Sequence, residues 1–121
     1  MGNPKRYEVH FVDDALQDLK EIVQYLLDRD EIEYAQEISD KIKKGAEEQL
    51  FTLPFRGHPV PELKDLAPEF REIHIPPYRI IYEPVEEEGM VWILFVAHER
   101  RNIQGLLIDR ILNEPLDESD S

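Results

Sequence analysis

The chain has 121 residues, 27 acidic against 14 basic side chains, and a formal net charge of −13. This length fits one compact domain with one core, and the negative charge disfavours long-range attraction to nucleic acid. Cysteine is absent, which excludes disulfides and thiolate chemistry, and no stretch approaches the roughly 18 apolar residues of a membrane helix.

The first half of the chain predicts a strand followed by two helices. Residues 5–12 (KRYEVHFV) alternate polar and apolar side chains, as a half-buried strand does. Apolar residues then recur at spacings of three and four over about 14–29 and again over about 31–52, which is typical of amphipathic helices. We expect Asp13 to cap the first helix with its carboxylate, and the short connection predicts an antiparallel helical hairpin.

The second half predicts a loop, three strands and a helix. The loop is marked by residues that interrupt helices and central strands, namely Pro54, Gly57, Pro59 and Pro61. Strands are expected over 69–75, 78–84 and 90–97, with a corner at Pro76-Pro77 and a turn over 86–89. The nearly unbroken apolar run 90–97 is expected to be buried on both faces, and a last helix over about 102–112 follows it.

These elements predict an α+β fold in the order β-α-α-β-β-β-α. The helical hairpin should pack on one face of a small, mostly antiparallel sheet, with the first strand beside the three-strand meander. We expect a single domain over residues 1–113. The segment 114–121 is rich in acids and lacks bases, so we expect a disordered tail.

Few groups in the sequence could carry out chemistry. No nucleophile elbow is present, and His10, His58, His74 and His98 lack zinc-ligand spacing, so neither a metal nor an organic cofactor is expected. The remaining candidates are basic residues of the second half: Arg71, His74, Arg79, His98, Arg100 and Arg101. Arg79 lies within a strand and requires a partner, either a carboxylate of the fold or an external anion. His98 is either a packing residue or an acid–base group.

Several short motifs in this order resemble the RelE/ParE superfamily of bacterial toxins, closest to its ParE-like (plasmid stabilisation) branch. They are PFRG at 54–57, VPEL at 60–63, FREI at 70–73, YRIIY at 78–82 and ILFVAHERR at 93–101. The resemblance covers roughly residues 5–112. It implies a cytoplasmic toxin of a type II toxin–antitoxin system that forms a hetero-oligomer with a cognate antitoxin, and the lack of an apolar leader in MGNPKRYEV agrees with that location.

The resemblance leaves the target open between two branches. ParE-like toxins act on DNA gyrase and are not thought to be nucleases, which would make Arg79, Arg100 and Arg101 target-binding residues. RelE-like toxins cleave mRNA on the ribosome, and here Arg71, Arg79, His74 and His98 would be the catalytic set. The chain lacks a tyrosine after His98 and is strongly acidic, and both features favour gyrase. A third interpretation is a non-toxic, repurposed protein-binding module.

Overall fold

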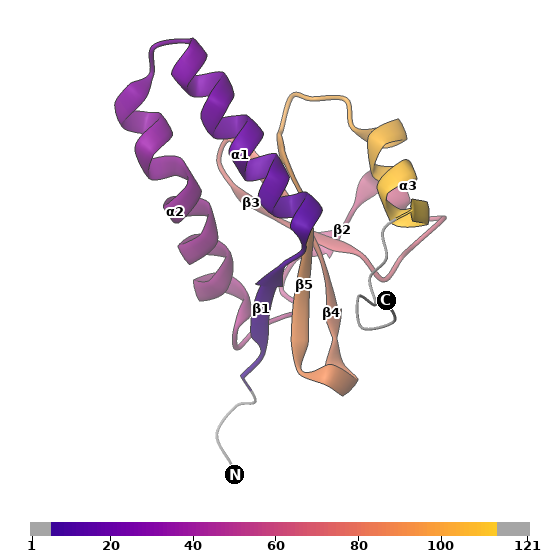
Figure 1. Ribbon diagram of the computed structural model, residues 1–121. Coiled ribbons are helices and arrows are strands. Elements are labelled where there is room, and N and C mark those ends of the chain that lie inside the picture. Colours follow the sequence, from indigo (N-terminus) through magenta and orange to yellow (C-terminus); the bar gives the residue numbers. More distant parts are fainter. Residues whose placement is uncertain (1–5, 114–121) are drawn as a thin grey trace.

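The computed structural model describes residues 6–113 and has the predicted order of elements, with one short strand and two 3₁₀ turns added (Figure 1). Its elements are β1 (Glu8–Phe11), α1 (Asp13–Asp28), α2 (Ile32–Leu50), β2 (His58–Pro59), η1 (Pro61–Leu63), β3 (Arg71–Ile75), β4 (Tyr78–Val85), η2 (Glu86–Glu88), β5 (Met90–His98) and α3 (Gln104–Asn113). The expected acidic tail, 114–121, lies outside the described residues.

The five strands form one sheet in the order β1-β5-β4-β3-β2. Strands β3, β4 and β5 form the predicted antiparallel meander, and β1 lies parallel to β5. Ile81 pairs with Phe95 and Tyr82 pairs with Ile93, so Leu94 is an extra residue in β5. Such a bulge bends its strand and redirects the backbone groups that follow it.

The helical hairpin covers one side of the sheet, and α3 lies on the other side (Figure 1). The apolar stripes of α1 and α2 supply the hairpin's share of the core, including Leu19, Ile38 and Ile42. Gly45 lets α2 approach the sheet closely, because a Cβ at that position would lie 2.9 Å from Cδ1 of Ile75. None of the helices within residues 6–113 is both long and apolar enough to cross a membrane.

Strand pairing determines which side chains share a face of the sheet. Ile75, Tyr78 and His98 are paired across β3, β4 and β5, and Ile75 faces the hairpin. His74 and Arg79 are the adjacent pair in register and therefore face the opposite side. The four basic candidates that lie on strands are thus divided between the two faces, with Arg71 and His98 on the hairpin side.

Side chains close the part of the β5 edge that β1 does not reach. The register of β1 ends at Ile93, and beyond it Asp18 accepts the backbone N–H of Val96 at 2.9 Å. Arg110 donates to the backbone carbonyl of Leu94 at 3.0 Å. Buried backbone groups need hydrogen-bond partners. Beyond Ile93, Asp18 and Arg110 therefore supply hydrogen bonds that a longer β1 would otherwise make.

Two local expectations require correction. Asp13 was expected to cap α1, but it is the first residue of the helix. The capping position belongs to Val12, which makes no side-chain capping bond. Asp13 instead contributes negative charge to the first turn, where it interacts favourably with the positive end of the helix dipole. The proline-marked loop also contains β2, which was not predicted because two residues are too few to show a period.

Candidate functional site

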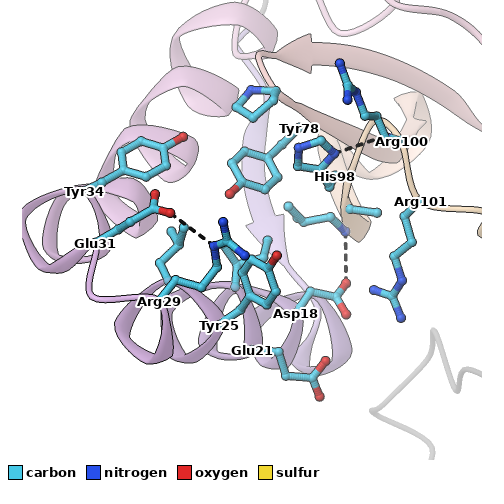
Figure 2. Close-up of a pocket in the computed structure, with 15 residues that line it drawn as sticks. Asp18, Glu21, Tyr25, Arg29, Glu31, Tyr34, Tyr78, His98, Arg100 and Arg101 are labelled. Carbon is cyan, nitrogen blue, oxygen red and sulfur yellow. Dashed lines mark hydrogen bonds and ion pairs between the residues drawn. The ribbon is translucent and has the colours of Figure 1, made fainter.

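An open cleft of about 750 Å³ lies between the hairpin and the end of the sheet (Figure 2). Its polar lining includes three tyrosines, one histidine, three arginines and three acids, namely Tyr25, Tyr34, Tyr78, His98, Arg29, Arg100, Arg101, Asp18, Glu21 and Glu31. Arg29 is paired with Glu31 at 3.3 Å, which leaves Arg100 and Arg101 as the exposed cations of the rim. Figure 2 shows Tyr78 between Tyr34 of α2 and His98 of β5. Aromatic walls with cations at the rim suit a segment that has both apolar and acidic side chains.

Tyr78 and His98 form the floor of this cleft. Their rings meet edge to face, with centroids 5.8 Å apart. Burial raises the pKa of Tyr78 to about 12, so its hydroxyl stays protonated at neutral pH. The backbone N–H of Arg100 donates to Nδ1 of His98 at 3.1 Å, which is compatible with a neutral ring that carries its proton on Nε2. Tyr78 therefore offers a hydroxyl that can donate or accept a hydrogen bond.

Arg79 lies on the opposite face of the sheet and is held between two carboxylates. Its guanidinium donates to Glu62 at 2.7 and 2.9 Å and to Glu72 at 2.6 Å. The hydrogen bonds that Arg79 donates to Glu62 raise the pKa of Arg79 and lower the pKa of Glu62. Of the two partners foreseen for Arg79, the structure supplies a carboxylate within the fold, and it supplies two.

His74 belongs to the same cluster as Arg79. Its Nε2 lies 2.8 Å from Oε2 of Glu72, and Nε2 of His58 lies 3.6 Å from the same oxygen. The surrounding shallow cleft of about 480 Å³ has a lining that includes three glutamates and two arginines, namely Glu62, Glu72, Glu99, Arg79 and Arg100. The excess of carboxylates makes this surface unfavourable for a phosphate group.

Arg71 makes its contacts outside this cluster, with the proline-marked loop. Its Nε donates to the backbone carbonyl of Gly57 at 3.0 Å, and its guanidinium lies 5.9 Å from the ring centroid of Phe55. Strand alternation puts it on the face opposite His74 and Arg79. Arg71 therefore holds the proline-marked loop against β3.

The structure does not bring the six candidates into one cluster. His74 and Arg79 share the shallow cleft, whereas His98 and Arg101 line the tyrosine-lined cleft. Arg100 lines both. The RNase interpretation requires Arg71, Arg79, His74 and His98 around one phosphate, and these four residues are divided between opposite faces.

Sequence reasoning missed the carboxylates that organise these clefts. Glu62 and Glu72 were not among the candidates, because only the pairing of β3 with β4 brings Glu72 to Arg79. Asp18 could have been noticed, because it occupies the apolar stripe of α1 between Ala15 and Ile22. An acid at an inward position of a helix indicates a buried partner, here Arg110.

Three solved structures share this fold. The RelBE2 toxin–antitoxin complex of Mycobacterium tuberculosis matches with 24% identity over 79% of this chain and 97% of that chain, at a TM-score of 0.53. The chromosomal ParDE system of Pseudomonas aeruginosa matches with 16% identity over 78% and 97%, at 0.60. An arginine-to-alanine double mutant of Escherichia coli RelE in the free state matches with 12% identity over 90% and 98%, at 0.55. These likenesses establish the RelE/ParE-like fold.

The family follows from the sequence itself. The model of the ParE toxin of type II toxin–antitoxin systems, parDE, matches residues 9–103. The chain belongs to this family, within the RelE/ParE superfamily. No curated protein matches the sequence closely enough to add a relative.

Proposed function

We propose that this toxin acts on DNA gyrase as a binding protein and is neutralised by a cognate antitoxin in the cytoplasm. One observation favours gyrase over mRNA as the target. Arg79, the basic residue at the centre of the would-be catalytic set, is already neutralised by Glu62 and Glu72. A ribonuclease needs uncompensated positive charge where the phosphate develops its charge.

The arginines after β5 are better placed to meet a protein target. Arg100 and Arg101 are exposed and follow β5 directly. They lie at the rim of the tyrosine-lined cleft, where side chains of a partner could reach both the cations and the aromatic rings. Acidic segments of gyrase would pair with them despite the net charge of the chain, because screening limits charge effects to about 8 Å at physiological salt.

The surface of the hairpin supports an antitoxin partner. Tyr25, Leu27 and Ile32 are exposed at the tip where α1 meets α2. The similar RelBE2 structure of Mycobacterium tuberculosis is a toxin–antitoxin complex. An amphipathic antitoxin helix with acidic flanks would cover the exposed apolar residues and reach the cations of the tyrosine-lined cleft.

The deciding test is supercoiling by purified gyrase of the same bacterium in the presence of the purified toxin. We expect inhibition by the wild-type protein and weaker inhibition by the double variant Arg100→Ala/Arg101→Ala. The matched control is Lys43→Ala/Lys44→Ala, which removes two adjacent exposed cations from α2. Normal supercoiling with the wild-type toxin would contradict the proposal.

Expression in the host separates the alternatives. Growth arrest with SOS induction supports gyrase poisoning, because broken DNA triggers that response. Arrest without SOS, relieved by His74→Ala, would favour ribosome-dependent mRNA cleavage. Normal growth with the antitoxin absent would favour the non-toxic binding module.

A further inference from the structure

Two histidines and a glutamate from the neighbouring strands β2 and β3 meet at the edge of the sheet. His58 comes from β2, and Glu72 and His74 come from β3. Each offers one ligand atom, and these atoms all lie within 4.8 Å of one another. We propose that His58, Glu72 and His74 form a binding site for a divalent transition-metal ion of the zinc class.

The donor atoms converge around one carboxylate oxygen. Oε2 of Glu72 lies 2.8 Å from Nε2 of His74 and 3.6 Å from Nε2 of His58. A tetrahedral zinc ion with bonds of about 2.0–2.1 Å holds its ligand atoms about 3.3 Å apart. His58 and His74 are 57% and 45% exposed, so small ring rotations can bring both nitrogens to that spacing.

Neighbouring groups already orient the ligands. Nδ1 of His58 lies 3.0 Å from the backbone carbonyl of Pro59, which keeps the proton on Nδ1 and leaves the Nε2 lone pair toward Glu72. Glu72 is only 2% exposed, and Arg79 holds its other oxygen, Oε1, at 2.6 Å. Hydrogen bonds of this kind to ligating histidines and carboxylates fix ligand orientation in metal sites.

The nearby cation does not prevent binding, because its charge is compensated. Arg79 makes a two-pronged ion pair with Glu62, so Glu62, Glu72 and Arg79 together carry a net negative charge. When a metal ion binds, Nε2 of His74 gives up the proton that it donates to Glu72, and the neutral ring carries its proton on Nδ1 instead. No net loss of a proton from His74 is then required.

The donor set indicates which ions would bind. Two imidazole nitrogens and one carboxylate oxygen suit Zn²⁺ and its neighbours in the transition series, whereas Ca²⁺ and Mg²⁺ prefer oxygen ligands. Three protein ligands leave at least one position for water. The ion would join β2 to β3 across a strand pair of only two residues, and so hold the proline-marked loop.

Calorimetry with ZnCl₂ on the full chain, purified without a polyhistidine tag, tests this proposal. We expect one ion per chain and a Kd raised at least about tenfold in His58→Ala and in His74→Ala. His10→Ala is the matched control, because His10 is also an exposed strand histidine and should leave the Kd unchanged. Circular dichroism checks that each variant is folded.

Cobalt gives an independent readout of coordination. Co²⁺ bound by the wild-type chain should show visible absorption bands of a low-coordinate nitrogen–oxygen site, and ZnCl₂ should displace them. Both histidine variants should lose these bands. The proposal is overturned if the wild-type chain binds no Zn²⁺, or if binding survives both histidine substitutions. Supercoiling plays no part in either measurement, so this result stands apart from the gyrase proposal.

Discussion

Asp18 of α1 and Arg110 of α3 form a buried ion pair across 92 residues of sequence, with N–O distances of 2.6 and 3.0 Å. The side chain of Asp18 is only 6% exposed. The pair connects the hairpin to the last helix, and both residues also bond the backbone of β5. It is therefore a single contact that joins three elements on both sides of the sheet.

Replacing Arg110 with alanine should destabilise the fold by about 3–5 kcal/mol at neutral pH, because it leaves Asp18 buried without its cation. Burial already raises the pKa of Asp18, and losing Arg110 raises it further. The penalty applies while Asp18 is ionised in the folded state, so it should shrink as the pH falls through that raised pKa. Urea unfolding at neutral and mildly acidic pH measures both effects. Lys44→Ala, which removes an exposed cation, should change stability by at most about 0.5 kcal/mol.

The ion pair of Glu62 and Arg79 should make the fold sensitive to acid. Hydrogen bonds from Arg79 lower the pKa of Glu62 below its ordinary value of 4.5. The stabilisation is therefore complete above 4.5 and is lost as the pH falls through the lower folded-state pKa. Urea unfolding over an acidic pH series should show a shallower pH dependence for Glu62→Gln than for the wild type. Glu48→Gln, an exposed change in α2, should retain the wild-type slope, and equal slopes in all three proteins would contradict the assignment.

Gly57 should tolerate no side chain. A Cβ there would lie 2.5 Å from the backbone oxygen of Glu72 and 2.6 Å from the hydroxyl of Tyr82. That hydroxyl accepts the Gly57 N–H at 2.9 Å, so the clash also disturbs a buried hydrogen bond. We expect Gly57→Ala to cost about 1–3 kcal/mol in thermal or urea unfolding. Gly105→Ala in α3 has open space and should be neutral or stabilise by up to about 1 kcal/mol.

Tyr25 should contribute to antitoxin binding and little to folding. Its side chain is 59% exposed and lines the tyrosine-lined cleft, where a partner would bury it. Tyr25→Ser should weaken antitoxin binding at least tenfold, which corresponds to about 1.4 kcal/mol. Calorimetry against the purified cognate antitoxin measures this. Leu66→Ser, an equally exposed change outside that cleft, should bind normally, and equal losses in the two variants would argue against docking there.

Regular periodicity made most of the fold predictable. The stripes of α1 and α2 span several turns, and the alternation in β3 and β4 is bounded by prolines, so element type and order followed directly. The position of β1 was not predictable in detail, since nothing local to Glu8–Phe11 specifies a parallel partner in β5. Such a pairing depends on which edge of the sheet remains unpaired once the meander has formed.

The candidate site was less predictable, because its chemistry depends on pairs distant in sequence. The sequence singled out Arg79 correctly as a residue that needs a partner, but Glu62 lies 17 residues away in a loop without a period. His58 and His74 showed no metal spacing because the pairing of β2 with β3 brings them together, and β2 itself was not predicted. Tyr25, Tyr34 and Tyr78 were not among the candidates, because only the packing of the hairpin against the sheet brings them into one cleft.

The parallel pairing of β1 with β5 also determines when the protein can fold during its own synthesis. Glu8 pairs with Met90, so 82 residues (90 − 8) must be added to the chain after β1 before its partner exists. Counted from Glu8 to Met90, at about 5–20 residues per second, this takes about 4–16 s. During that interval the emerging helical hairpin has no completed sheet to cover. The sheet can therefore be completed only after β5 has been synthesised, and until then the edge that pairs with β1 does not exist.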